Sequence, residues 1–489
     1  MATAFVGLLV LYAVGLYLER GVAPRPARWR RPPIAYLTFL TVGFAWYALL
    51  LGVTGRALLA LLISLAGAFA LQVVSNAKYA LLREPLVFSD FALIPQILRH
   101  PRLYYVELLQ RLRTWLLIAP VIALLLLWLW LEPVMQPYWA RFGLIALAPA
   151  LLALPPYLPG LGPALRRAAA RHLPVPEPEA ATERLGLAAF LLLSFLRWLD
   201  TRPPQVTEPL PLPAIAGRNP APLVVAVQSE SFLDLRRLRD DAPALPNLAR
   251  AQQRALAWGP LGVPAIGAYT MRTEYAFLSA TANRAMGFDG LDPYLRADRF
   301  PLPCLPRLLS QAGWETLFLH PHAAHFFRRH KVMPALGFNR MVTEEAFPNV
   351  ERIGPYVSDA ALTTELLRQM EEARDPAFIF TVTMENHGPW RPGRLPGLEQ
   401  EAEIYGQHLV HADAMLGRVL DALDGMDRPW ALCFFGDHPP ILRSIGDPAP
   451  DHRSDYVLLT SADPPAEGPR ELDAAELGTL LRQRIAAMT

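Results

Sequence analysis

The sequence predicts a multi-span α-helical membrane domain followed by an α/β domain with a mostly parallel sheet. Hydrophobic residues make up 53% of the 489 residues, and most of this excess lies before about residue 200. Strand-length apolar runs alternate with helical patterns after residue 222. A Pro-rich stretch separates the two regions. We therefore expect a transmembrane domain over 1–200, a linker over 201–221 and a globular domain over 222–489.

Apolar segments of spanning or near-spanning length define the first domain, since a helix needs about 20 mostly apolar residues to cross a bilayer. Such segments are found at about 4–18, 34–53, 56–75, 114–131 and 142–159. A sixth run, 185–199, is shorter and is interrupted by Arg197. It is either a short span or an amphipathic helix at the surface. The first domain is thus predicted to hold five or six helices.

The placement of arginine predicts orientation, because cytoplasmic loops are enriched in Lys and Arg. The loop after the first span, the loop over about 76–113 and the Arg-rich segment 166–171 are assigned to the cytoplasm. The second domain then lies outside the cytoplasm only if 185–199 crosses the membrane, which is the arrangement we expect. If it does not cross, either the first loop breaks the charge rule or the second domain faces the cytoplasm.

The second domain contains continuous apolar runs that suit strands buried on both faces of a parallel sheet. These runs lie at 223–227, 316–319, 378–382 and 431–435. Helical spacing over 358–373 and 401–423 fills the intervals between them. In open sheets of this kind, ligands bind beyond the carboxyl ends of the strands. The residues that follow each run are therefore the candidates for a site.

Polar residues follow all four runs. Glu230 comes after the first, His320 after the second, the segment 385–387 after the third, and Asp437 with His438 after the fourth. A charge directly after a buried strand is costly unless it is paired or bound to a metal. Carboxylates with an imidazole suit Mn²⁺, Mg²⁺ or Zn²⁺. An isolated Asp-His pair is more often a loop or a helix cap, but four clusters in this order favour one metal site with an activated hydroxyl nucleophile.

These clusters resemble the motifs of a known family. The matching segments are 227–232, 267–275, 320–329, 384–390 and 436–438. They are similar to the lipoteichoic acid synthase-type phosphoglycerol transferases, which are membrane-anchored members of the alkaline phosphatase and sulfatase superfamily. The resemblance covers the C-terminal half and the preceding multi-span anchor. It implies an alkaline phosphatase/sulfatase-like fold for a catalytic domain over 222–489.

The resemblance also implies a metal centre and a nucleophile. Glu230, Thr270, Asp437 and His438 would bind one divalent metal ion, with Mn²⁺ preferred and Mg²⁺ or Zn²⁺ as alternatives. Thr270 would in addition be the nucleophile. Thr273 is the second choice, but it matches a position that residues without a hydroxyl can occupy.

Substrate-binding residues follow from the same resemblance. His387 would bind the phosphate or move protons, Arg329 would contact the phosphate, and Phe327 would line the pocket. Some relatives carry Trp at the position of Phe327, and an acidic or amide residue at that of His322. Because of these departures, the sequence leaves the transferred headgroup open.

The implied reaction is transfer of a phosphoglycerol-type group from a membrane phospholipid to a glycan or another cell-envelope hydroxyl, through a phospho-threonine. The alternatives are phosphoethanolamine transfer, phosphate or sulfate ester hydrolysis, a non-catalytic membrane sensor or scaffold, and a transporter. Sulfatases need a Cys or Ser that is converted to formylglycine, which Thr270 does not provide. The net charge of +2 and the lack of a basic patch argue against nucleic acid as a partner. We expect a multi-pass protein of the cell (inner) membrane with an extracytoplasmic catalytic domain.

Two further features receive structural interpretations. His408 and His411 fall on one side of the helix predicted over 401–423, where such pairs are most often surface residues. Cys304 and Cys433 are expected to be unpaired, and Cys433 lies within an apolar run. Neither feature is given a chemical role.

Overall fold

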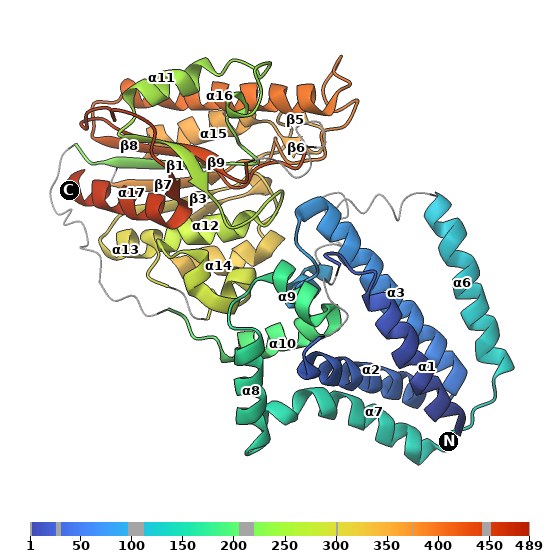
Figure 1. The fold of residues 1–489 in the computed structure, drawn as a ribbon. Helices are drawn as coiled ribbons and strands as arrows, with labels where there is room; N and C mark the ends of the chain where they lie inside the picture. Colours follow the sequence, from blue (N-terminus) through green and yellow to red (C-terminus); the bar gives the residue numbers. More distant parts are fainter. Residues whose placement is uncertain are drawn as a thin grey trace. The chain divides into compact units, whose positions relative to one another are not determined.

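The computed structural model describes residues 2–25, 31–95, 112–204, 220–299, 302–374, 376–442 and 451–488. The chain separates into two compact units, Met1–Arg202 and Pro203–Thr489 (Figure 1). Most of the predicted linker over 201–221 lies outside the described residues.

The first unit is helical. Its helices are α1 (Ala2–Glu19), α2 (Pro33–Thr54), α3 (Ala57–Leu82), α6 (Leu112–Leu131), α7 (Tyr138–Ala153), α8 (Leu161–His172), α9 (Pro178–Leu185) and α10 (Leu187–Asp200). All of them except the polar helices α8 and α9 largely overlap a predicted apolar segment. In the described part of the chain, α1, α2 and α3 are long and apolar enough to cross a membrane, and two shorter apolar stretches, Ala119–Leu131 and Tyr138–Ala153, accompany them.

The surface of this unit suits lipid. Among the described residues, every large apolar side chain that is exposed lies before residue 200. Such a surface is unfavourable in water and favourable in a bilayer. Helix α10, which covers most of the predicted sixth segment, has 14 residues and is about 21 Å long. Its crossing of the membrane stays a prediction.

The second unit contains the predicted, mostly parallel sheet. Its order is β10-β2-β9-β8-β1-β7-β3-β4. The strands are β1 (Leu223–Ser229), β2 (Ala257–Gly262), β3 (Glu315–Leu319), β4 (Arg340–Val342), β7 (Ala377–Val382), β8 (Trp430–Gly436), β9 (Ser454–Thr460) and β10 (Leu472–Asp473), with a separate hairpin of β5 (Arg352–Ile353) and β6 (Tyr356–Val357). Only β9 runs antiparallel to its two neighbours, β8 and β2, in this sheet. The predicted fold class is confirmed.

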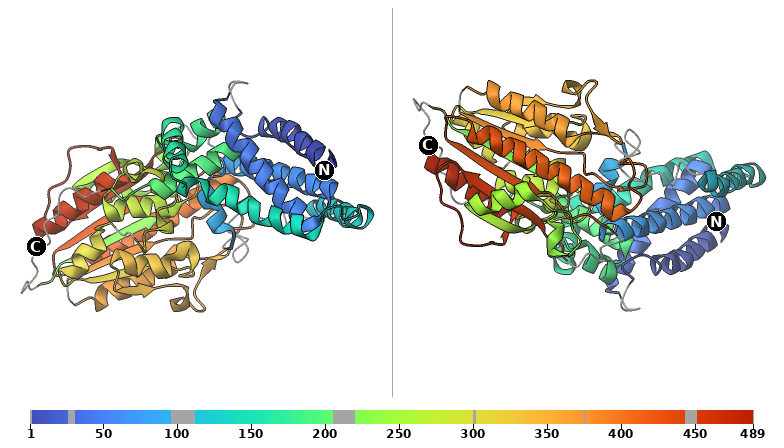
Figure 2. Two further views of the ribbon diagram at one scale, coloured as in Figure 1. Left: turned by 90° about the horizontal axis from the view of Figure 1, so that it is seen from below. Right: turned by 90° about the horizontal axis from the view of Figure 1, so that it is seen from above.

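Helices cover both faces of the sheet (Figures 1 and 2). One layer holds α11 (Pro246–Arg254), α15 (Asp359–Glu372) and α16 (Glu401–Asp424), and the other holds α12 (Thr270–Ser279), α13 (Leu305–Gln311), α14 (Arg329–Leu336) and α17 (Ala474–Met488). Burial on both faces explains why the central strands read as continuous apolar runs.

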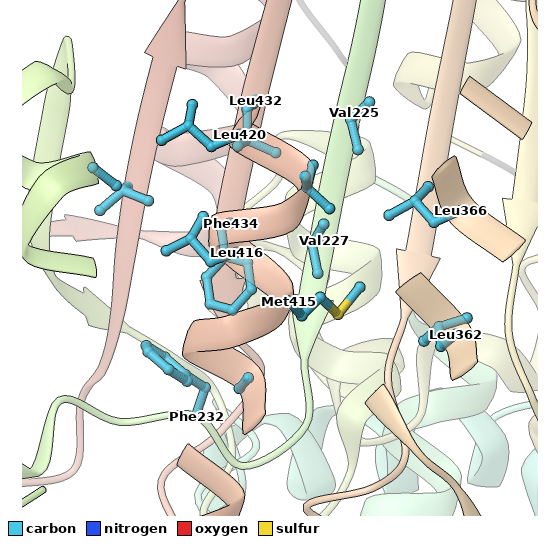
Figure 3. Close-up of a cluster of buried hydrophobic side chains, with 14 of the residues drawn as sticks. Val225, Val227, Phe232, Leu362, Leu366, Met415, Leu416, Leu420, Leu432 and Phe434 are labelled. Atoms are coloured by element: carbon cyan, nitrogen blue, oxygen red, sulfur yellow. The ribbon is translucent and has the colours of Figure 1, made fainter. Parts of the chain in front are cut away.

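Alternate residues of each strand pack into the two layers. Val225 and Val227 of β1 lie with Leu416 and other residues of α16 in one core (Figure 3). On the opposite face, the ring of Phe277 from α12 lies 4.5 Å from that of Phe435, centroid to centroid. The sheet is therefore held rigidly between two cores, and the loops after its strands start from fixed positions.

Candidate active site and a second carboxylate–histidine cluster

Three neighbouring parallel strands bring the predicted loops together. Strand β1 lies between β7 and β8, and Ser229 pairs with Gly436 at the end of the register. The backbone N–H of Glu230 donates to the Thr383 hydroxyl at 2.9 Å. Carboxyl ends of parallel strands meet at one edge of a sheet, so the residues that follow β1, β7 and β8 share one site.

Glu230, Asp437 and His438 form a buried cluster at this edge. Each offers a ligand atom within 4.8 Å of the others. His438 Nε2 lies 3.4 Å from Glu230 Oε1 and 3.3 Å from Asp437 Oδ2. Ser231, to which the sequence analysis gave no role, holds the cluster together: its hydroxyl donates to Glu230 Oε1 at 3.0 Å and its backbone N–H to Asp437 Oδ1 at 2.8 Å.

The charges of this cluster fit a divalent cation. Burial raises the pKa of Glu230 to about 8, and the adjacent Asp437 carboxylate adds to the rise. Asp437 Oδ2 is buried and has no hydrogen-bond partner among the described residues. Two adjacent buried carboxylates remain ionised together only with a compensating positive charge. Carboxylate oxygens and imidazole are suitable ligands for such an ion.

Thr270 is the first residue of α12, and the turn before it lies beside the cluster. Gly267 donates its backbone N–H to the Pro439 carbonyl at 3.0 Å. One helical turn later, the Thr273 hydroxyl donates to the Asp437 carbonyl at 2.6 Å. Tyr269, the N-cap, is left-handed with φ of 63°, a strained conformation of the kind found at functional sites. The helix N-terminus adds partial positive charge at this position.

Arg329 is buried in an ion-pair network. Its Nη2 lies 2.7 Å from Glu274 Oε2, and the exposed fractions of the two side chains are 1% and 0%. Its Nη1 lies 2.9 Å from His320 Nε2, while His320 Nδ1 lies 3.0 Å from the Val382 carbonyl. His320 is thus neutral with its proton on Nδ1, and burial followed by the charge of Arg329 keeps its pKa well below the usual value. Glu274, which received no role from the sequence, therefore determines the position of Arg329.

The predicted headgroup residues surround Arg329. Its guanidinium carbon lies 5.5 Å from the centre of the Phe327 ring. Phe327 and Arg328 both have positive φ, 51° and 57°, so two successive non-glycine residues are left-handed here. His322 is half-buried, with its ring 6.0 Å from that of His320.

His387 is half-buried in the loop after β7. Its Nδ1 lies 2.8 Å from the Gly388 carbonyl and 3.2 Å from the Tyr356 hydroxyl. Donation to the carbonyl places the proton of the neutral ring on Nδ1 and makes Nε2 the acceptor. Burial lowers the pKa of His387, whereas the charge of Asp437 acts in the opposite direction. The side chain is therefore within electrostatic range of the cluster.

The interpretation of His408 and His411 as surface residues is wrong. His408 is fully buried and His411 partly buried, and the Nδ1 atoms of both contact Glu385 Oε1, at 2.7 and 2.6 Å. Burial opposes ionisation of Glu385, but hydrogen bonds from the two histidines outweigh it and hold its pKa at about 2. The sequence carried a signal for this second cluster: two histidines at helical spacing and a carboxylate directly after a buried strand. Local sequence could not show that they meet.

Several solved structures are similar to this chain at low identity. The phosphoglycerol transferase GacH from Streptococcus pyogenes, in complex with sn-glycerol-1-phosphate, is 20% identical with a TM-score of 0.45, over 56% of this chain and 79% of that one. The lipoteichoic acid synthase LtaP from Listeria monocytogenes is 21% identical with a TM-score of 0.43, over 54% and 71%.

Sequence relatives are more informative. A capsular polysaccharide biosynthesis protein, RkpI, from Rhizobium meliloti (strain 1021) is 35% identical over 401 residues, or 80% of this chain and 74% of the relative. A putative cyclic β-1,2-glucan modification protein from the same organism is 30% identical over 48% of this chain and 38% of the relative. The Sulfatase family model matches residues 222–476, which is more than half of the chain and includes all the residues of both clusters. The chain therefore belongs to the sulfatase family, within the superfamily that its motifs predicted.

Proposed function

We propose that the protein transfers a phosphoglycerol-type group from a membrane phospholipid to a glycan or another cell-envelope hydroxyl, through a phospho-threonine on Thr270. The observation that carries the proposal is the buried cluster of Glu230, Asp437 and His438 beside the N-terminus of α12. Three apolar helices before the catalytic unit support a membrane anchor and therefore a lipid donor. The names of the two relatives from Rhizobium meliloti, capsular polysaccharide biosynthesis and glucan modification, support a glycan acceptor.

Thr270 is better placed than Thr273 to act as the nucleophile. The Thr273 side chain is fully buried and donates its hydroxyl proton to the Asp437 carbonyl. The Thr270 side chain keeps 8% of its surface exposed, whereas that of Thr273 has none. A nucleophile must present an accessible oxygen to phosphorus, which Thr273 cannot do without breaking its hydrogen bond.

Glu230, Asp437, His438 and Thr270 would hold one divalent metal ion, for which we propose Mn²⁺ with Mg²⁺ or Zn²⁺ as alternatives. Such an ion, when bound, lowers the pKa of a neighbouring hydroxyl and offsets negative charge on phosphate. The orphaned Oδ2 of Asp437 supports this ligand set.

The reaction consists of two displacements. Thr270 Oγ1 loses its proton and attacks phosphorus, the bond to the diacylglycerol oxygen breaks, and that oxygen gains a proton and leaves as an alcohol. An acceptor hydroxyl then loses its proton and attacks the phospho-threonine, the bond from phosphorus to Thr270 Oγ1 breaks, and Oγ1 regains a proton. His387, with Nε2 as its acceptor nitrogen, suits the proton transfers. Arg329 supplies positive charge, while Phe327 and His322 contribute to the headgroup pocket.

The test is intact-mass analysis of the purified full chain with Mn²⁺ and phosphatidylglycerol. We expect a phosphoglycerol adduct and released diacylglycerol. Both are lost in Thr270→Val, which has nearly the same shape, and retained at a lower rate in Thr270→Ser, which keeps a hydroxyl. An adduct that persists in Thr270→Val contradicts the assignment of the nucleophile. Turnover with phosphatidylethanolamine alone would replace phosphoglycerol by phosphoethanolamine, and turnover with neither lipid would remove the proposed reaction.

The proposed location is the cell membrane, with several spans and the catalytic unit outside the cytoplasm. The Arg-rich loops agree with this orientation if the segment 185–199 crosses the membrane. Labelling of single cysteines with a membrane-impermeant reagent tests it, after replacement of the buried Cys304 and Cys433. A cysteine at exposed position 452 must react in intact cells from which any outer membrane has been removed; protection there would place the unit inside.

A further inference from the structure

The second cluster, formed by Glu385, His408 and His411, has no part in the reaction proposed above. Glu385 lies in the loop after β7, and the histidines lie three residues apart on α16. This spacing puts two side chains on the same face of a helix. One ligand atom from each of the three residues lies within 4.8 Å of the other two. The cluster therefore has the composition and spacing of a metal site.

The contacts of Glu385 place this cluster in a closed environment. Its Oε1 accepts from both histidine Nδ1 atoms, and its Oε2 accepts the backbone N–H of Asp359 at 2.7 Å. The side chains of Glu385 and His408 are 1% and 0% exposed, and that of His411 is 29% exposed. Of the three side chains, that of His411 is therefore the one that reaches the solvent.

A second carboxylate beside the cluster has no partner. Asp359 is 1% exposed, and neither of its carboxylate oxygens has a hydrogen-bond partner among the described residues. Within the described ranges, no Lys or Arg side chain forms an ion pair with Asp359 or Glu385. A divalent cation at the cluster would supply positive charge beside both carboxylates.

We propose that Glu385, His408 and His411 bind a second divalent transition-metal ion, with Asp359 providing further negative charge beside it. Two imidazoles and one carboxylate are a favourable ligand set for Zn²⁺ and for other ions of the first transition row. Gln407 Nε2 lies 3.0 Å from His411 Nε2. Because the amide can be turned over, its oxygen can accept the remaining N–H of a metal-bound His411, as ligand histidines require.

The position of the site in the chain suggests what it does. Glu385 lies two residues before His387, and Arg394 donates to the backbone carbonyls of both residues. An ion bound by Glu385 would connect this loop to α16 through the two histidines. It would also attract the carboxylate of Asp359 at the start of α15. The site thus positions His387 and does not touch the transferred group. The inference does not depend on which group is transferred.

The test is metal stoichiometry of the purified full chain in detergent, stripped with a chelator and dialysed against Zn²⁺. Bound zinc per chain is measured by mass spectrometry for the wild type, Asp437→Asn, His411→Asn and the double variant. We expect two equivalents for the wild type, one for Asp437→Asn, one for His411→Asn and none for the double variant. His411 is partly exposed, so its substitution leaves the core intact, and Glu385→Gln provides a second, nearly isosteric variant. Exposed His452→Asn is the matched control and must keep both equivalents.

A single result decides the inference: Asp437→Asn must retain one equivalent that His411→Asn and Glu385→Gln both remove. If the wild type binds one equivalent and His411→Asn leaves it unchanged, the second site is overturned and the cluster is a hydrogen-bonded brace. A protein that binds two equivalents in this pattern but transfers no lipid headgroup keeps this inference and loses the proposed function.

Discussion

The two carboxylate–histidine clusters lie at the same edge of one sheet but are built differently. Glu230, Asp437 and His438 all come from loops that follow adjacent strands, beside Thr270 at the start of α12. Glu385 comes from such a loop as well, but its partners, His408 and His411, come from the face of α16. The first cluster therefore has the proposed nucleophile beside it, whereas helices enclose the second. Similar ligands can serve reaction in one place and positioning in another, depending on what else faces them.

The largest expected effect is confined to the first cluster. Asp437→Asn removes a ligand and a negative charge without changing shape, and we expect transfer to fall by roughly 10³-fold or more. The rate of diacylglycerol release in vesicles measures it. Retention of more than about a tenth of the activity would contradict the distinction between a reactive and a positioning cluster.

Glu274, a buried carboxylate outside both clusters, tests whether compensation of its charge by a cationic side chain differs from compensation by a metal ion. Glu274→Ala leaves Arg329 buried without its ion-pair partner, and we expect about 3–5 kcal/mol of lost stability. Urea unfolding of the full chain, followed by tryptophan fluorescence, measures it. The loss should be the same with Zn²⁺ or with a chelator, and a metal-dependent loss would show that Glu274 belongs to a metal site.

The second cluster is expected to act on rate more weakly. His411→Asn should lower kcat about 10–100-fold, because residues that support a catalytic group without touching substrate have effects of this size. KM for the lipid should change little, since His411 does not contact the headgroup segment. Steady-state kinetics with saturating Mn²⁺ separate the two constants. A change confined to KM would place the second cluster in substrate binding.

The smallest effect concerns a histidine outside both clusters. The pKa of His320 is held well below 6.5 in the folded protein, so the unfolded chain binds a proton that the folded chain does not as pH falls below about 6.5. This contribution to stability is present above pH 6.5 and is lost at up to about 1.4 kcal/mol per pH unit below it. In a chelator, His320→Asn should flatten the profile of unfolding free energy against pH between 5 and 6.5. An unchanged slope would assign the pH dependence to other buried histidines.

Several features could be predicted from local sequence because short-range physics determines them. Continuous apolar runs at 223–227 and 431–435 indicated strands buried on both faces, and β1 and β8 are such strands. The residues that follow parallel strands must share an edge, so Glu230 and Asp437 could be expected to meet. Apolar length alone indicated α1, α2 and α3.

Other features depend on contacts between residues far apart in the chain. Glu385 and His411 are 26 positions apart, and the helical spacing of His408 and His411 does not show which face of α16 meets the sheet. Likewise, nothing in the local sequence around Arg329 indicated that Glu274, 55 positions earlier, would be its ion-pair partner. Sequence by itself determined the membrane-anchored α/β architecture and the first cluster, because hydrophobic periodicity and strand-end position are local properties. Only the tertiary structure determined that the residues of the second cluster meet and that Glu274 is the ion-pair partner of Arg329, because burial and charge compensation depend on how the helices pack onto the sheet.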